Sequence, residues 1–345
     1  MGTLLSIFAL SVLRLTAALL ACCLVACATP RVQNHPDTTQ NPRLTPDAVI
    51  MADGYRLPLA VSSPQGTPVA VVLALHGFND YRASFEEPAG YLAGHGVITY
   101  AYDQRGFGET QQRGIWPGSN RMRDDAAVVS RMLCEQHPDL PLFILGESMG
   151  GAVAMDMMQA YTDSCIAGVI LVAPAVWGWT TMPALQRSAL RFLAHSFPGY
   201  SPTGEGLGVV ASDNREMLYE KWLDPLVIKE TRIDAIYGLT NLMESALLAS
   251  GDINRPALIL YGERDEIIPL RATCQMLHTL PTLPPPRWRM ALYPDGYHML
   301  TRDLQAEVVY ADMLAWLTDR EASFPSDQEV VLQTPRLLTF CGDSL

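Results

Sequence analysis

A serine lies at the centre of a short glycine-rich motif, Gly146-Glu147-Ser148-Met149-Gly150-Gly151. The apolar run 140–145 precedes this motif, and the helix-compatible run 152–161 follows it. Between a strand and a helix, Gly-x-Ser-x-Gly predicts a nucleophile elbow, a tight turn that exposes the serine hydroxyl above a sheet. Glycines suit this turn because Cβ atoms would clash across it. Ser148 is therefore the candidate nucleophile.

A serine hydroxyl needs a base to take its proton and a carboxylate to orient that base. Asp265 follows the apolar run 257–261, and His298 follows the run 288–293. The order serine, acid, histidine along the chain is the order found in the α/β-hydrolase triad. Glu263 and Glu266 lie in the same loop as Asp265 and are alternative acids.

A third loop completes the chemistry that an acyl transfer requires. His76-Gly77-Phe78 follows the apolar run 69–75. The backbone N–H of Phe78 can pair with that of Met149 to stabilise a developing oxyanion. We expect His76 itself to be a structural hydrogen-bonding group rather than a catalyst.

Another glycine-containing loop, Asp103-Gln104-Arg105-Gly106-Phe107-Gly108, follows the run 97–102. It lacks the third glycine of the dinucleotide-binding fingerprint. We interpret it as a turn beside the serine motif.

The elements that must position these loops alternate between strand and helix. This alternation predicts a mostly parallel sheet flanked by helices, in which loops at the carboxyl ends of strands converge. A hairpin with an Asp53-Gly54 turn is expected before it. The alternation of strands and helices stops over 174–255, which has no strong strand pattern, and we expect an inserted helical cap at about 175–230. The expected strands are 69–75, 97–102, 140–145, 166–173, 257–261 and 288–293, and the expected helices are 85–93, 122–135, 152–161, 241–249, 272–280 and 304–317.

Together these residues resemble the α/β-hydrolase superfamily, and within it the monoacylglycerol lipase and lysophospholipase-like serine hydrolases. The resemblance implies the α/β-hydrolase fold and a Ser148, His298 and Asp265 triad. It favours Asp265 over the two glutamates because Asp-x-x-Ile-Pro matches the family spacing. Glu147 departs from the family, in which histidine is common before the nucleophile. The matching positions are His76-Gly77, Asp103-x-x-Gly106-x-Gly108 with Arg113-Gly114, the serine motif, Gly262-x-x-Asp265 and His298-x-Leu300.

The activity that the resemblance implies is hydrolysis of carboxylic esters of lipid-like substrates, of the monoacylglycerol or lysophospholipid type. No metal or organic cofactor is expected. The same triad also suits a thioesterase or an amide or peptide hydrolase. A non-catalytic envelope lipoprotein that kept the fold as a binding scaffold is a further alternative.

The amino terminus predicts export and attachment to a membrane. The apolar stretch 15–26 is too short to span a bilayer comfortably and is typical of a signal peptide. Leu24-Val25-Ala26-Cys27 resembles the bacterial lipobox, which implies cleavage before Cys27 and acylation of its thiol, for example with palmitate. Ala28 after the cysteine resembles outer-membrane sorting, facing the periplasm. A plain secretory signal, or an uncleaved anchor, is the alternative.

We therefore expect a signal peptide over 1–26, a flexible tether over 27–46 and a hydrolase domain over 47–345. In an oxidising compartment the remaining cysteines could form two disulfides, with three possible connectivities. None of them has metal-ligand spacing. These cysteines are Cys134, Cys165, Cys274 and Cys341.

The charge of the chain argues against one class of partner. The formal net charge is -12, and the only lysines are Lys221 and Lys229. No basic stripe is present that could neutralise a phosphate backbone. Nucleic acid is therefore not an expected partner.

Overall fold

The computed structural model describes residues 28–36, 40–161, 165–204, 206, 208–253, 255–281, 288–331 and 335–342. The predicted signal peptide and Cys27 lie outside these residues. Across the described ranges, no helix combines the length and the apolar character needed to cross a bilayer.

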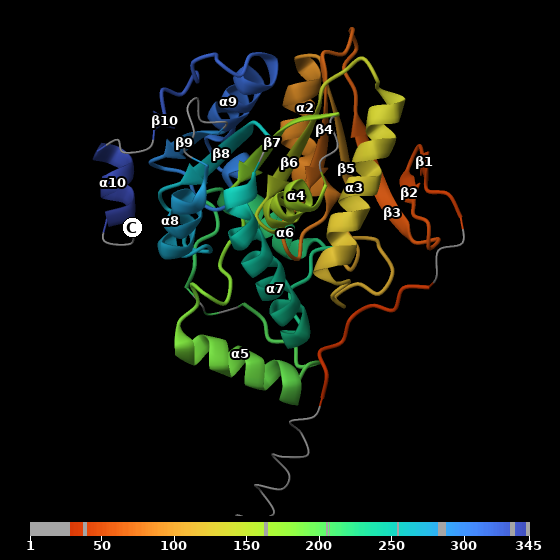
Figure 1. Cartoon of the computed structure of the whole chain (residues 1–345), viewed down its shortest axis with the longest axis vertical. Helices are drawn as coiled ribbons and strands as arrows, with labels where there is room; N and C mark the ends of the chain where they lie inside the picture. Colours follow the sequence, from red (N-terminus) through yellow and green to blue (C-terminus); the bar gives the residue numbers. More distant parts are fainter. Residues whose placement is uncertain are drawn as a thin grey trace, which may run out of the picture.

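A single ten-stranded sheet runs through the molecule in the order β1-β2-β3-β5-β4-β6-β7-β8-β9-β10 (Figure 1). Strands β4 to β9 are parallel to their neighbours in this group, whereas β1, β2, β3 and β10 pair in antiparallel fashion. The mostly parallel sheet of the predicted fold class is thereby confirmed. The strands are β1 (Arg43–Thr45), β2 (Ala48–Ile50), β3 (Arg56–Ser62), β4 (Ala70–Leu75), β5 (Val97–Tyr102), β6 (Leu142–Glu147), β7 (Ile166–Val172), β8 (Ala257–Gly262), β9 (Trp288–Tyr293) and β10 (Glu329–Val330).

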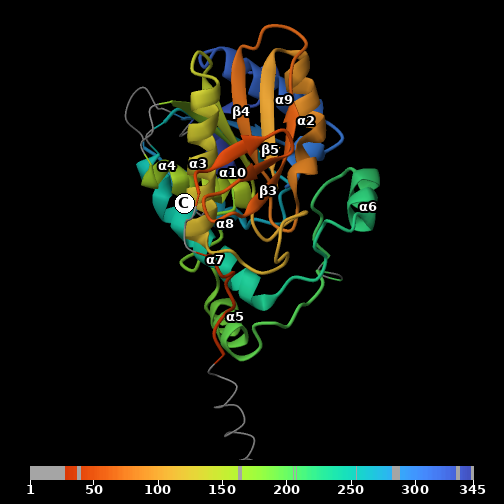
Figure 2. The same cartoon turned by 90° about the vertical axis from the view of Figure 1, so that its right-hand side faces the viewer.

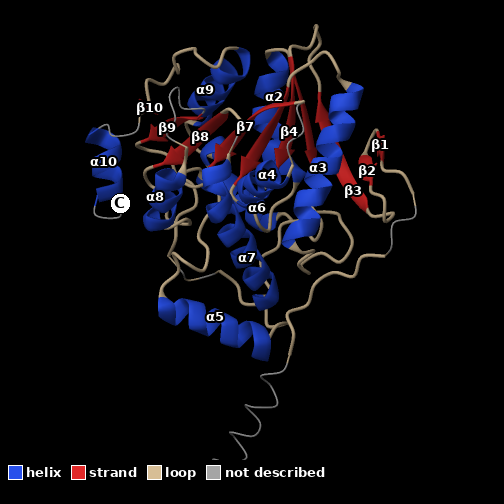
Figure 3. Ribbon diagram, viewed as in Figure 1, coloured by secondary structure: helices blue, strands red, loops and turns tan. Residues whose placement is uncertain are grey.

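Helices cover both faces of the sheet (Figure 3). Successive side chains of a strand point to opposite faces, so a strand buried on both faces must be apolar throughout. In β4, Val71, Leu73 and Leu75 belong to one hydrophobic core, and the alternate residues belong to the other. The first core contains side chains of α3 (Ser119–Gln136), α4 (Met149–Ala160), α7 (Ile233–Ala249) and α8 (Leu270–Thr279), and the second those of α2 (Glu86–Gly94) and α9 (Ala306–Thr318).

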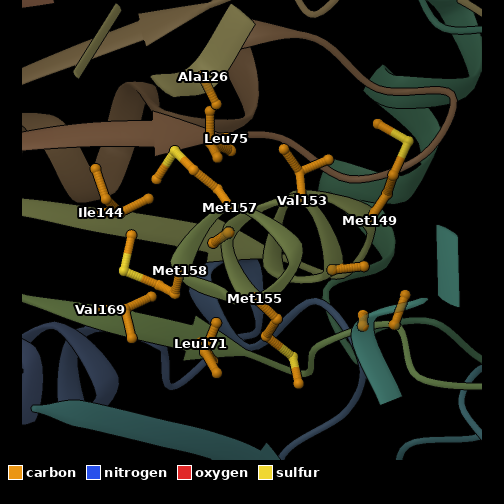
Figure 4. Close-up of a cluster of buried hydrophobic side chains, with 14 of the residues drawn as sticks. Leu75, Ala126, Ile144, Met149, Val153, Met155, Met157, Met158, Val169 and Leu171 are labelled. Atoms are coloured by element: carbon orange, nitrogen blue, oxygen red, sulfur yellow. The ribbon is translucent and has the colours of Figure 1, made fainter. Parts of the chain in front are cut away.

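Helix α4 carries the centre of the first core. Val153, Met157 and Met158 are fully buried against strand residues such as Ile144 and Val169 (Figure 4). This packing holds the amino-terminal end of α4 at the carboxyl edge of the sheet. The serine motif lies at that end.

The expected strands are present within two residues of their predicted ends, and most expected helices within three. Helix α7 is the exception, because it begins at Ile233 rather than near residue 241. Gly238 lies inside the added turns and weakens helix propensity. A Cβ at this position would lie 2.4 Å from the Trp116 ring, so tertiary packing requires the glycine.

The segment 173–232 between β7 and α7 carries α5 (Ala184–Ser196) and α6 (Arg215–Leu223), and we call it the cap. Figure 2 shows the two helices well apart, α5 below the sheet and α6 to one side of it. Helix α6 has no buried residue, and α5 buries only Ala194 and Ser196. The apolar side chains of these helices therefore form no core of their own.

Residues 28–36 and 43–45 of the predicted tether over 27–46 make specific contacts with the rest of the chain. Gln33 is buried, its backbone N–H donates to the Trp116 carbonyl at 2.9 Å, and its side chain donates to the Ile115 carbonyl at 3.0 Å. Residues 43–45 form β1. The polar composition suggested a solvated linker, but these polar groups find partners far along the chain.

The carboxyl-terminal region also carries elements that the sequence analysis did not predict. Strand β10 pairs with β9, and α10 (Pro335–Cys341) follows it. Of the three possible connectivities, the structure has Cys134 bonded to Cys165 and Cys274 bonded to Cys341. The second disulfide ties α10 to α8.

Candidate active site

The serine motif forms a tight turn between β6 and α4. Ser148 has φ 52° and ψ −113°, a left-handed backbone that non-glycine residues adopt rarely. A Cβ on Gly150 would lie 1.9 Å from the Leu75 carbonyl oxygen, and one on Gly146 would lie 2.5 Å from the Gly150 carbonyl oxygen. Only glycine fits either position, and the turn projects the partly exposed Ser148 from the sheet.

The three predicted side chains form one hydrogen-bonded chain. His298 Nε2 lies 2.9 Å from Ser148 Oγ, and His298 Nδ1 lies 2.8 Å from Asp265 Oδ2. The other carboxylate oxygen, Oδ1, accepts the N–H groups of Ile267 at 2.8 Å and Ile268 at 3.0 Å. Because the carboxylate faces Nδ1, it favours the tautomer whose Nε2 can accept the serine proton.

The two alternative acids point elsewhere. Glu263 pairs with Arg336 at 2.9 Å, and Glu266 accepts the backbone N–H of Val210 at 2.8 Å. The acid loop and the histidine loop are packed directly together, since a Cβ on Gly262 would lie 2.3 Å from the Gly296 carbonyl oxygen. The structure therefore brings Asp265, and neither glutamate, to His298.

The predicted oxyanion residues flank the serine. Met149 is the first residue of α4, and amides of the first helical turn have no acceptor within the helix. On the other side, a Cβ on Gly77 would lie 3.5 Å from the Cβ of Ser148, so the loop that carries Phe78 lies against the nucleophile. Both residues predicted to donate to the oxyanion therefore lie on segments that border Ser148.

His76 holds this loop in place. Its Nε2 accepts the backbone N–H of Gln104 at 2.9 Å, and its Nδ1 lies 2.8 Å from the Gly77 carbonyl oxygen. Burial lowers the pKa of His76, which favours the neutral ring that this pattern of one acceptor and one donor requires. These contacts fit the structural role expected from the sequence.

The glycine loop after β5 has the turn conformation that the sequence predicted. Gly106 has φ 86° and Gly108 has φ 56°. A Cβ on Gly108 would lie 2.3 Å from a carboxylate oxygen of Asp103. Arg105 of this loop is fully buried between Asp53 and Asp125.

Sequence reasoning missed a buried ion network beside the site. Arg302 donates to Asp80 at 2.8 Å and to Glu147 at 2.7 Å, and Lys221 of the cap also pairs with Asp80. Burial would raise the pKa of Asp80, but Arg302 and Lys221 together lower it well below its usual range. The only sequence signals were that Arg302 lies four residues after His298 and that lysine is so rare.

Comparison with known proteins assigns the class. The family model described as "Serine aminopeptidase, S33" matches residues 66–305, and the chain belongs to that family. It therefore has the α/β-hydrolase fold that its sheet, helices and elbow define.

Two relatives and one solved structure show which members of this class the chain is similar to. The chain is 25% identical over 301 residues to the human monoglyceride lipase, covering 82% of this chain and 96% of that protein. It is 23% identical over 269 residues to the monoacylglycerol lipase of Mycolicibacterium smegmatis, covering 76% and 93%. A soluble variant of the monoglyceride lipase of Saccharomyces cerevisiae superimposes with a TM-score of 0.67 at 19% identity, covering 86% of this chain and all of that one. The prediction of a carboxylic-ester hydrolase is confirmed at the level of class.

Proposed function

We propose that the chain is a serine hydrolase that cleaves carboxylic esters of lipid-like substrates, of the monoacylglycerol or lysophospholipid type. The observation that carries this proposal is the hydrogen-bonded chain from Ser148 through His298 to Asp265. It joins loops after three different strands at one edge of the sheet, which is the arrangement that nucleophilic catalysis by serine requires.

In the proposed reaction, Ser148 Oγ attacks the acyl carbonyl carbon while His298 Nε2 takes the hydroxyl proton. The backbone amides of Phe78 and Met149 stabilise the oxyanion. The imidazolium, stabilised by Asp265, then gives its proton to the leaving alcohol. Water, deprotonated by the same imidazole, attacks the acyl-enzyme, and the carboxylic acid and Ser148 are released.

Two observations support a lipid-like substrate. Relatives that span most of the chain are named monoglyceride lipases. The cap also presents large apolar side chains to solvent, among them Leu185, which is 82% exposed, and Tyr219 and Leu223, each more than 60% exposed. Exposed apolar groups on a cap suit an enzyme whose substrates are amphiphilic.

The test is a series of glyceryl or p-nitrophenyl esters from two to ten carbons, measured below their micelle concentrations. Each buried methylene contributes up to about 0.8 kcal/mol, so kcat/KM should rise by up to about fourfold per carbon. A flat or falling profile would contradict a lipid-like substrate. Ser148→Ala should lower turnover by several orders of magnitude, and activity within about tenfold of wild type would contradict the triad.

A second candidate changes the bond and keeps the triad. It is favoured by the description of the family as a serine aminopeptidase. Matched ester, thioester and amide substrates with the same acyl group decide between the two. Because an ester is intrinsically more reactive than the matched amide, clear turnover of the amide would identify an amide or peptide hydrolase, and turnover of the ester alone would support the ester hydrolase.

We also propose that acylated Cys27 anchors the enzyme in a bacterial envelope, at the outer membrane facing the periplasm. The disulfides Cys134–Cys165 and Cys274–Cys341 support an oxidising compartment. Metabolic labelling with a fatty-acid analogue, followed by fractionation of the membranes, tests the proposal. Label that persists in Cys27→Ser would mean that another residue carries the lipid.

A further inference from the structure

The three residues that follow Phe78 all bind the cap. Asn79 accepts the backbone N–H of Ile228 at 3.0 Å, and its side chain donates to Thr231 at 2.6 Å. Asp80 pairs with Lys221. The hydroxyl of Tyr81 donates to Asp224 at 2.6 Å. The loop that carries one of the two oxyanion donors is therefore held from the cap side.

The contacts of these three residues with the cap are hydrogen bonds and ion pairs, and Ile228 of the cap also packs against the first core. Helix α6 has no buried residue. A cavity of about 260 Å³, lined by Ser84, Met217 and Lys221 among others, lies beside the contact, so α6 is not tightly packed there. The side chain of Lys221 is nevertheless only 19% exposed, because it reaches inward to Asp80. Its ion pair is thus a principal attachment of α6 to the loop.

The ion pair between Lys221 and Asp80 belongs to a network that extends to the residue before the nucleophile. Asp80 also binds Arg302, and Arg302 binds Glu147, which directly precedes Ser148. The second oxygen of Glu147 accepts the hydroxyl of Thr301 at 2.9 Å. The network contains two acids and two bases, so its charges balance. Glu147 of this network is at the position before the nucleophile, where the resembling hydrolases commonly have histidine.

We propose that Lys221 is a positioning residue, which fixes the backbone amide of Phe78 for the oxyanion by tying α6 to Asp80. The inference rests on the proposed serine-hydrolase function and adds the cap to it as a support of the oxyanion loop. The amide is two residues from Asp80 in the same loop. Left-handed Asn79, with φ 64°, makes the turn between them and is itself bonded to the cap.

This role predicts a particular kinetic signature. Removing one oxyanion donor lowers kcat by about 10²–10³, and a displaced donor loses part of that effect. Lys221→Met should therefore lower kcat by about tenfold or more and leave KM within about twofold. Asp80 keeps Arg302 as a partner in this variant, but the network then holds two acids against one base, so Lys221→Arg is the control that keeps the charge.

The experiment compares Lys221→Met with Lys221→Arg and Lys229→Met in the full chain. Lys229 is the only other lysine, and it bonds the Asp224 carbonyl within the cap. We expect Lys221→Arg to recover most of the activity and Lys229→Met to resemble wild type. The readouts are kcat and KM on a monomeric p-nitrophenyl ester, and the rate of inactivation by a fluorophosphonate.

Three results would overturn the inference: wild-type kcat in Lys221→Met, a rise in KM alone, or equal losses in the two lysine-to-methionine variants. If Lys221→Met does not fold, Tyr81→Phe decides, since it removes only the bond to Asp224 and should lower kcat severalfold at constant KM. The fluorophosphonate needs Ser148 but no particular acyl group. A wild type that reacts with this probe and hydrolyses no ester would refute the proposed substrate and leave the inference testable by the inactivation rates.

Discussion

Replacing Asp265 by asparagine tests the geometry of the site, because the two oxygens of its carboxylate have different partners. Oδ1 accepts two backbone N–H groups, from Ile267 and Ile268. Oδ2 faces His298 Nδ1 at 2.8 Å. In the variant, the amide oxygen must take the first position, since an NH₂ group there would meet two donors. The NH₂ group then points at Nδ1.

That placement imposes the wrong tautomer on the imidazole. Nδ1 must accept a hydrogen bond from the amide, so the proton moves to Nε2, which then donates to Ser148 instead of accepting its proton. The same change in a serine protease lowers kcat by about 10⁴, which corresponds to about 5.5 kcal/mol of transition-state stabilisation. We expect Asp265→Asn to lower kcat by a similar factor and to leave the fold intact.

The assay is steady-state hydrolysis of p-nitrophenyl butyrate at saturating substrate, with circular dichroism to verify folding. Glu263→Gln is the matched control, because Glu263 is in the same loop and pairs with Arg336. We expect this control to stay within about threefold of wild type, since it leaves the triad untouched. Activity of Asp265→Asn within about tenfold of wild type, or a larger loss in Glu263→Gln, would show that Asp265 is not the acid.

Three further predictions concern the fold and the anchor. Gly150→Ala should destabilise the protein by more than about 3 kcal/mol in urea unfolding, because its Cβ would lie 1.9 Å from a carbonyl oxygen of β4. Gly90→Ala is the control: Gly90 is an exposed position of α2 with nothing within 4 Å of a Cβ, so the change should stabilise the protein by about 0.5–1 kcal/mol, and equal effects of the two variants would contradict the assigned turn. Cys274→Ser should lower stability by about 4 kcal/mol on the loop-entropy model, since the disulfide to Cys341 closes a separation of 67 residues; an unchanged urea midpoint would contradict that bond. Cys27→Ser should abolish incorporation of the fatty-acid label and remove the enzyme from the membrane fraction.

The parts of the fold that could be predicted are those governed by local pattern. The apolar run 69–75 indicated a strand buried on both faces, and β4 is such a strand. Candidate site residues were visible because the elbow needs glycines at fixed positions and because acid and histidine follow successive strands. Parallel strands place such loops at one edge whatever the rest of the sequence is.

The cap and the terminal segments could not be predicted to the same depth, because their conformations depend on distant partners. Nothing local distinguishes Gln33 in a solvated linker from the buried Gln33 that bonds Ile115 and Trp116. Helix α6 has no apolar face turned to a core, so its position depends on ion pairs and hydrogen bonds with loops more than a hundred residues away.

The sequence by itself determined the alternation of strands and helices, the tight turn at Ser148 and the set of groups available for acyl transfer. These follow from hydrophobic period, glycine spacing and chain order, which are properties of neighbouring residues. The tertiary structure decided which of three clustered acids faces His298, which cysteines pair, and that Lys221, Asp80, Arg302 and Glu147 form one network. Each of these depends on the distance between side chains that only the folded chain brings together.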